Sequence, residues 1–323
     1  MRAARVAALA ALLLAGLIVY VTQPLTGLAT RAVHTPADPS RLRSHVEKLA
    51  REMVPRTVSS PANLERASRY IHDTFAASGA AVAFQSYETS RGQFRNVVAR
   101  MGPDSAERLV VGAHDDAAAA GIGADDNASG VAGLLELTRI ASVVALPIRV
   151  DFVAFSTEEP PYFGTDSMGS HVHARGLEKE GASNRAMICL EMIGFFTDAP
   201  ASQSFPIRGL KLVYPSEGNF VTVVGCLGQA GLVRRVKRAM AESIALPVRS
   251  MNAPRFVPGI DFSDHSNYWD ANFDAVMVTD TAFYRNANYH ESSDAPETLD
   301  YQRMALVVDG VFAAIQDLGR DVD

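Results

Sequence analysis

The chain has 323 residues, of which 48% are hydrophobic and 20% are charged, so it is long and apolar enough to bury a large core. The formal net charge of -6 argues against a nucleic-acid-binding protein, because such proteins need a clustered basic face to neutralise phosphates. The two cysteines, Cys189 and Cys226, permit one disulfide in an oxidising compartment without requiring it.

The N-terminus carries a hydrophobic export signal. Arg2 and Arg5 precede an uncharged run from residue 6 to residue 21, which is typical of a signal peptide or signal-anchor. The run is short against the roughly 20 residues that span a bilayer, and "GLATRA" is a poor cleavage site. We predict a signal-anchor or signal peptide over 1–28 and a linker over 29–39. The remainder is then exported, either anchored and facing the periplasm or extracellular side, or secreted after cleavage. A buried core helix is the alternative.

Helices and strands are expected to alternate along the rest of the chain. Two helices come first, over 40–51 and from Ser60 to Gly79, the second with Pro61 at its first position. Short strand-like runs follow at 81–88, 94–101 and 108–113. Further helices are expected over 129–142, 166–177, 231–244 and 296–319, and further strands over 148–156, 186–195, 219–226 and 273–280. Continuous apolar strands that alternate with helices predict an α/β fold with a mostly parallel mixed sheet between helical layers, in one domain over 40–323.

Histidines and carboxylates follow the carboxyl ends of four of these strands. Ligands of such sheets bind beyond these ends, so we expect the side chains to converge on one crevice. They are His114 and Asp116 after the 108–113 strand, Asp126 before the 129–142 helix, Glu158 and Glu159 after the 148–156 strand, Glu191 within 186–195, and His290 after the 273–280 strand.

Two imidazoles with several carboxylates suit zinc and, less selectively, manganese or cobalt. A single catalytic zinc usually takes three protein ligands and a water, and this set exceeds that number. The composition therefore allows two ions, which would need a bridging carboxylate and a base for the water between them.

The motifs resemble those of the M28 zinc aminopeptidases, which use two metal ions. The resemblance covers about Ser40 to the C-terminus and rests on "AHDDA…GADDNASG", "FSTEEPPYFGTDSMGS", "CLEMIG", "FSDHSNYW" and "TDTAFYRNANYHESSDAPETLD". It implies the three-layer zinc-peptidase fold, two Zn²⁺ per chain with Mn²⁺ or Co²⁺ as possible substitutes, and peptide substrates with a free N-terminus. By position, the implied metal ligands are His114, Asp126, Glu159, Glu191 and His290, with Asp126 as the bridge.

The same resemblance implies roles for the neighbouring residues. Glu158 would be the general base, and Asp116 would accept the other ring N–H of His114. Glu191 departs from the aspartate that is commonest in the family, although its longer side chain can reach the same ion. A non-proline cis peptide is implied between Asp126 and Asn127. Asp115 and Asp125 are interpreted as residues that bind no metal.

The substrate pocket is harder to assign from the sequence. His265 competes with His290 for the last ligand position, but its motif resembles the substrate-side segment, so we interpret it, with Asp264, as lining the pocket or supporting the ligands. Aromatic residues near the site are candidates for the pocket wall, and Arg285 is a candidate for a substrate carboxylate or an ordinary salt bridge. The aromatic candidates are Tyr268, Trp269, Phe283 and Tyr284. His171 and His173 are interpreted as surface residues of a helix.

Two other functions remain open from the sequence. Glutaminyl cyclases resemble this fold and use one zinc to expel ammonia from an N-terminal glutamine. A receptor-like ectodomain would bind peptides without cleaving them, but relatives of that kind lose ligands or the base, whereas every proposed position is filled here. The leading prediction is hydrolysis of the N-terminal residue of peptides.

Overall fold

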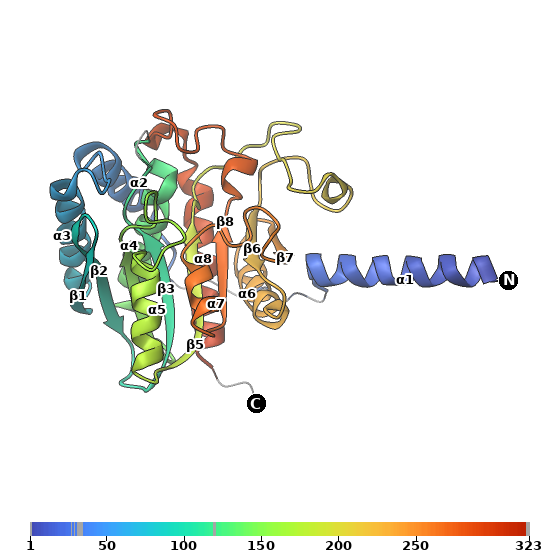
Figure 1. The fold of residues 1–323 in the computed structure, drawn as a ribbon, viewed down its shortest axis with the longest axis horizontal. Helices are drawn as coiled ribbons and strands as arrows, with labels where there is room; N and C mark the ends of the chain where they lie inside the picture. Colours follow the sequence, from blue (N-terminus) through green and yellow to red (C-terminus); the bar gives the residue numbers. More distant parts are fainter. Residues whose placement is uncertain (1, 27, 29, 31–34, 119–120, 321–323) are drawn as a thin grey trace.

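A mixed sheet of eight strands runs through the part of the chain that the structure describes (Figure 1). The computed structural model describes residues 2–26, 28, 30, 35–118 and 121–320. The strands lie in the order β1-β2-β4-β3-β5-β8-β6-β7, and the four from β4 to β8 are parallel neighbours. Their bounds are β1 (Ala81–Thr89), β2 (Gly92–Met101), β3 (Glu107–His114), β4 (Arg149–Phe155), β5 (Ser183–Glu191), β6 (Val221–Gly225), β7 (Val248–Asn252) and β8 (Ala275–Thr279).

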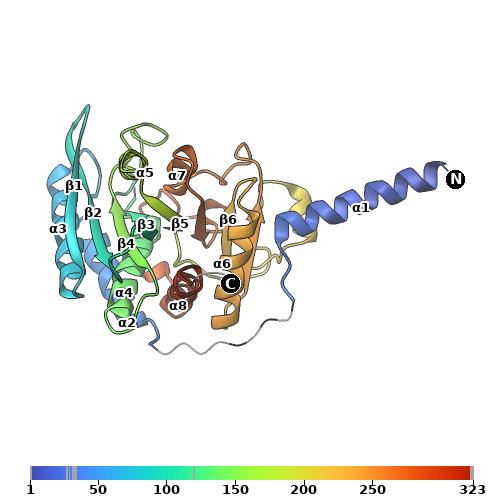
Figure 2. The same cartoon turned by 90° about the horizontal axis from the view of Figure 1, so that it is seen from below.

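Helices cover both faces of this sheet (Figure 2). One face packs against α2 (Pro39–Glu47), α3 (Pro61–Ala77), α4 (Gly130–Ala141), α6 (Ala230–Ser243) and α8 (Tyr301–Leu318). The other face packs against α5 (Gly169–Lys179) and α7 (His265–Asp270). The structure therefore confirms the predicted α/β fold with a mostly parallel mixed sheet between two helical layers.

The central strands are apolar on both faces because both faces are covered. From Leu109 to His114 every residue of β3 is buried, and so is every residue of β4 after Arg149. A continuous apolar run of this kind is the signature of a parallel sheet inside an α/β protein. Cys189 lies in β5 as a buried free thiol, and Cys226 is also free.

Several element boundaries differ from the sequence prediction. The first predicted helix ends at Glu47 and continues as a π turn over Lys48–Glu52, and the closing helix begins at Tyr301 after a 3-10 turn at Pro296–Thr298. The strand β7 and the short helix α7 were not predicted, because five or six residues give too little periodicity to detect.

The helix predicted over 166–177 begins only at Gly169. The reason is a close approach between this residue and the sheet. A Cβ on Gly169 would lie 2.1 Å from Asn96 Oδ1 and 2.5 Å from the Ser156 carbonyl oxygen, so only glycine fits there. The Gly169 N–H donates to that same carbonyl, which anchors the start of α5 on the end of β4.

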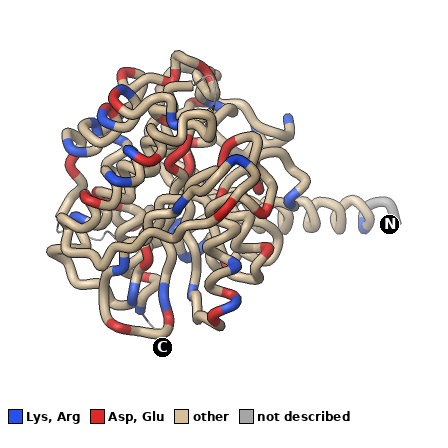
Figure 3. The backbone as a smooth tube through the Cα atoms, turned by 60° about the vertical axis from the view of Figure 1, so that its left-hand side comes forward, with Lys and Arg blue, Asp and Glu red and all other residues tan. Residues whose placement is uncertain are grey.

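The N-terminal apolar run forms the helix α1 (Arg2–Thr22), which projects away from the sheet. Its segment Arg5–Thr22 is long and apolar enough to cross a membrane and is not buried against the rest of the protein. Figure 3 shows no charged residue along α1 beyond its N-terminal end. Length and composition alone are equally compatible with a signal peptide and a signal-anchor.

Candidate metal centre

The predicted ligands meet at the carboxyl ends of the four parallel strands. His114 ends β3, Glu191 ends β5, and Glu158 and Glu159 follow β4 by three and four residues. The remaining two ligands lie on loops. They are Asp126, within the turn Ala124–Ser129 before α4, and His290, on the long connection from β8 to α8.

The first group of converging side chains consists of His114, Asp126 and Glu191. His114 Nε2 lies 3.3 Å from Asp126 Oδ1 and 3.4 Å from Glu191 Oε2. All three residues are buried, and their ligand atoms lie within 4.8 Å of one another. The arrangement can hold one metal ion.

The second group consists of Asp126, Glu159 and His290. His290 Nε2 lies 3.1 Å from Asp126 Oδ2 and 3.4 Å from Glu159 Oε1. The ring of Tyr289 stacks on the His290 imidazole at 3.8 Å between centroids, which restricts the orientation of that imidazole. His290 itself has a positive φ of 61°, an uncommon backbone conformation for a residue with a side chain.

Asp126 belongs to both groups and presents a different oxygen to each. Its Oδ1 faces His114 and its Oδ2 faces His290, which is the geometry of a carboxylate that bridges two ions. The Asp126–Asn127 peptide is cis, as the family resemblance predicts. Backbone N–H groups of Asp125 and Asp126 donate to the Asp294 carboxylate, which fixes this turn.

The carboxylates at the metal centre outnumber the imidazoles, so binding of a positive charge there is favourable. Burial opposes protonation of His114, but the carboxylates of Glu158 and Glu191 outweigh it and raise the pKa of His114 well above its usual value. The same balance raises the pKa of His290 to about 10, mainly through Asp126 and Glu159. Burial and the charge of Asp126 raise the pKa of Glu159 to about 7. Carboxylates and imidazoles that hold protons so tightly in the absence of an ion would exchange them for a divalent cation.

An unpaired polar atom also fits bound metal. Glu159 Oε1 is buried and forms no hydrogen bond among the described residues, although His290 Nε2 lies 3.4 Å from it. Leaving a carboxylate oxygen unpaired inside a protein costs free energy, and a cation between the two imidazoles would remove that cost.

Glu158 lies beside the first group without joining it. Its Oε2 is 4.0 Å from His114 Nε2, and burial raises the pKa of its carboxyl well above the usual value. Asp116 positions this segment, because its two oxygens accept from the backbone N–H groups of Glu158 and Glu159 at 3.1 and 3.0 Å. Asp116 Oδ1 also lies 3.4 Å from His114 Nδ1, on the far side of the ring from the candidate ion.

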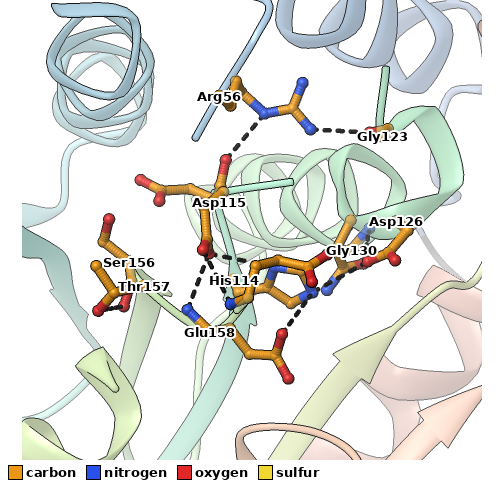
Figure 4. Close-up of polar contacts among 12 residues, drawn as sticks. Arg56, His114, Asp115, Gly123, Asp126, Gly130, Ser156, Thr157 and Glu158 are labelled. Carbon is orange, nitrogen blue, oxygen red and sulfur yellow. Dashed lines mark hydrogen bonds and ion pairs between the residues drawn. The ribbon is translucent and has the colours of Figure 1, made fainter. Parts of the chain in front are cut away.

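Arg56 is a supporting residue that sequence reasoning missed. Its buried guanidinium donates to the carbonyls of Asp115 and Gly123 at 2.9 and 2.8 Å, and so ties the segment directly after His114 to the turn that carries Asp126 (Figure 4). Ser263 was also missed, and its hydroxyl donates to Glu191 Oε2 at 2.6 Å. Arg56 lies outside the quoted motifs, whereas Ser263 lies in "FSDHSNYW", where the neighbouring Asp264 and His265 were singled out instead.

Asp125, Asp264 and His265 lie near the metal centre, and they differ in their hydrogen bonds. Asp125 accepts from Gly194 N and Asn286 Nδ2, so it braces the loops and belongs to neither group of ligands. Asp264 is buried, and both of its oxygens lack hydrogen-bond partners among the described residues. His265 belongs to neither group of ligands, and its Nε2 donates to the Ile260 carbonyl oxygen at 2.7 Å.

Three expectations about polar and aromatic residues are wrong. Tyr268 is fully buried in the core between the sheet and α5, where its hydroxyl pairs with His173 Nδ1 at 2.7 Å. His173 is therefore a core residue, because it points from α5 toward the sheet. Arg285 forms no salt bridge with a described residue and is no exposed anion site, since its buried guanidinium donates to Gln203 Oε1 and to the Phe195 and Phe220 carbonyls.

An apolar pocket of about 760 Å³, including the space at its mouth, opens beside the metal ligands. Glu191 and Tyr289 connect it to the two groups of ligands. The predicted wall residues Phe283 and Tyr284 line it, whereas Trp269 packs with the core around Tyr268. Other apolar lining residues come from the loop before β6, from strands β6, β7 and β8, and from the connection between β7 and α7, namely Phe205, Tyr214, Phe220, Val224, Met251, Ile260, Phe262 and Met277.

Sequence comparison relates the chain to metallopeptidases. The model of a family described as Peptidase family M28 matches residues 96–315. The uncharacterized protein YfbL of Escherichia coli (strain K12) is 45% identical over 287 residues, which are 86% of this chain and 88% of that protein. Leucine aminopeptidase 1 of Phaeosphaeria nodorum is 25% identical over 255 residues, which are 75% of this chain and 59% of that protein.

Solved structures share the fold at low sequence identity. The zinc aminopeptidase BSAP of Bacillus subtilis has a TM-score of 0.71 at 15% identity, with 87% of this chain and 95% of that chain covered. The glutaminyl cyclase of Porphyromonas gingivalis has a TM-score of 0.63 at 20% identity, with 86% and 98% covered. These likenesses establish the fold and do not choose between the two activities.

Proposed function

Because this chain belongs to peptidase family M28, we propose that it is an aminopeptidase that removes apolar N-terminal residues from peptides with the help of two zinc ions. Membership of the family supports hydrolysis, and the zinc aminopeptidase fold supports the metal. The finer assignments below come from the side chains of this chain.

One observation carries the proposal: Asp126 offers one carboxylate oxygen to each of two ligand groups. A site for one ion would need no second histidine and no shared carboxylate. His114 with Glu191 would complete the shell of one ion, and Glu159 with His290 that of the other. Two zinc ions so placed would lower the pKa of the attacking water and polarise the scissile carbonyl.

The protein's own proton carrier would be Glu158. It lies next to the ligands yet outside both groups, so it is free to take a proton from the attacking water and to deliver it to the departing amine. Asp116 holds the backbone of Glu158 and Glu159, so it would keep the base and one ligand in register with His114.

The pocket supports a preference for apolar N-terminal side chains. It adjoins Glu191 and is lined largely by aromatic and aliphatic residues, so a charged side chain would lose its hydration there without finding a partner. Leucine, methionine or phenylalanine would instead gain from burial.

The same features disfavour the two alternatives. A glutaminyl cyclase would have to bind the glutamine amide and use one zinc, whereas this pocket is mainly apolar and the second ligand group is complete. A receptor-like ectodomain would have no need for Glu158 and a full ligand set.

A panel of aminoacyl chromogenic substrates, measured together with metal content, tests the proposal. We expect two zinc ions per chain, and hydrolysis of leucyl, methionyl and phenylalanyl substrates in preference to glutamyl and lysyl ones. One zinc per chain with ammonia release from N-terminal glutamine would instead identify a cyclase. Peptide binding without turnover would identify an ectodomain.

A further inference from the structure

The C-terminal end of α1 is bound to the folded domain by polar contacts. Lys237 Nζ, on α6, donates to the carbonyls of Thr22 and Gln23 at 2.7 and 2.9 Å. Ser250 Oγ and Asn252 Nδ2, both on β7, donate to the carbonyls of Thr22 and Tyr20 at 2.9 and 3.1 Å.

These contacts satisfy backbone groups that a helix end leaves open. The last carbonyls of an α-helix have no partner within the helix, and a cationic side chain is favourable there. Arg234 extends the contact by donating to the Pro24 carbonyl at 3.1 Å, and Gly228 N donates to the Tyr20 hydroxyl at 3.3 Å. A signal peptide that is cleaved off would not need hydrogen bonds between its C-terminal end and the mature domain.

Exposed apolar side chains surround the place where α1 leaves the domain. Leu212 is 89% exposed, Leu227 is 56% exposed and Val213 is 40% exposed. Leu227 precedes the Gly228 that contacts α1, and Val213 lines a surface hollow together with Thr22 and Leu25. Figures 1 and 2 both show the yellow loop around residue 210 projecting beyond the sheet beside the domain end of α1.

The length of α1 brings a bilayer against this face. The apolar segment has 18 residues and at about 1.5 Å per residue would span roughly 27 Å, slightly less than a hydrocarbon core of about 30 Å. Because the helix is shorter than the hydrocarbon core and is held by the domain at its C-terminal end, the membrane–water interface must lie close to the domain. Three exposed basic residues, Arg208, Lys211 and Arg249, accompany the apolar side chains on this face. Basic residues at a membrane surface are attracted to anionic lipid headgroups.

We propose that a lipid bilayer seats against this face, with α1 retained as a spanning helix and Leu212, Val213 and Leu227 buried in the membrane interface. The surface formed by these three residues is the membrane-facing patch. The loop that supplies Leu212 also supplies Phe205 and Tyr214 to the apolar pocket, so the bilayer lies next to one wall of that pocket.

Depth-dependent quenching of tryptophan fluorescence tests the patch independently of any activity. The full-length chain is reconstituted in vesicles of phosphatidylcholine and phosphatidylglycerol whose acyl chains are brominated near the headgroup. Leu212→Trp and Leu227→Trp should lose at least half of the fluorescence they add to that of Trp269. Val143→Trp, at a 69% exposed position in the connection between α4 and β4, is the matched control and should lose none.

Equal quenching at all three positions, or none at Leu212 and Leu227, would overturn the membrane-facing patch. Intact-mass measurement of the protein from the membrane fraction tests retention of α1. A mass that includes residues 5–22 is expected, and a mature chain that begins after Thr22 would overturn the retained anchor.

Discussion

Two regions of this molecule place histidines in opposite electrostatic environments. At the carboxyl ends of the strands, His114 and His290 face Asp126, Glu159 and Glu191, and these carboxylates raise the pKa of both imidazoles. Between the sheet and the α5–α7 layer, burial instead lowers the pKa of His173 and of His265 to about 4.

The difference lies in the partners of each imidazole. His173 pairs with the Tyr268 hydroxyl and His265 with the Ile260 carbonyl, and both partners are neutral. Burial of a histidine therefore says little about function. An excess of buried carboxylate around the imidazole is what marks a site for a cation.

The largest expected effect separates proton transfer from metal binding within the first region. Glu158→Gln should keep both ions and lower turnover by about 10²–10⁴-fold, since the amide preserves size but cannot take a proton. Glu159→Gln is the matched control and should lower metal content and activity together. Metal analysis and steady-state kinetics measure both. Ions lost in the first variant and kept in the second would mean that the two glutamates have exchanged roles.

The next effect compares the two regions directly. His114→Gln should lose at least one ion per chain, and the apparent stability that saturating zinc provides should fall by about 3–4 kcal/mol. His173→Gln should retain all of its metal. Metal analysis with unfolding in the presence and absence of chelator decides the outcome. Equal metal loss in both variants would erase the distinction between the regions.

Lowering the pH should destabilise the protein through the second region, where His173 is buried between the sheet and α5. The folded pKa of His173, about 4, lies below the ordinary 6.5, so the unfolded chain binds more protons between these values and stability falls as the pH drops from 6.5 to 4. The shift corresponds to roughly 3 kcal/mol, with Asp151 and the arginines 100, 108 and 149 as the charged neighbours.

Urea unfolding at pH 4 and pH 7 measures this loss in the native protein and in His173→Gln. The variant should lose less stability than the native protein over the same interval. An identical loss would mean that the acid sensitivity does not come from His173 but from another buried imidazole such as His265.

The smallest effect is expected at Tyr268. Tyr268→Phe removes the hydroxyl that pairs with His173 and should lower the free energy of unfolding by about 1 kcal/mol. Turnover, KM and metal content should stay unchanged, because Tyr268 lies in the core and not in the pocket wall. A selective rise in KM would return Tyr268 to the substrate site.

The sequence by itself determined the layered sheet and the edge at which chemistry gathers. Continuous apolar strands such as β3 and β4 require cover on both faces, and a polar residue shortly after such a strand, like Glu158 three residues after β4, must lie near its carboxyl end. The resemblance of the motifs to the M28 family also predicted the cis peptide after Asp126, which residue spacing alone could not have indicated.

Only the tertiary structure decided which polar residues face one another. Local sequence does not show that His173 and His290 have different partners. On α5, His173 points to the Tyr268 hydroxyl, whereas His290, on the loop after β8, lies next to Asp126. Arg56 lies outside every motif and Arg285 inside one, yet each binds carbonyls of segments far along the chain, which neither context predicted. The seat of α1 on Lys237 joins residues more than 200 positions apart. Such contacts depend on how elements pack in space, and no local periodicity encodes that packing.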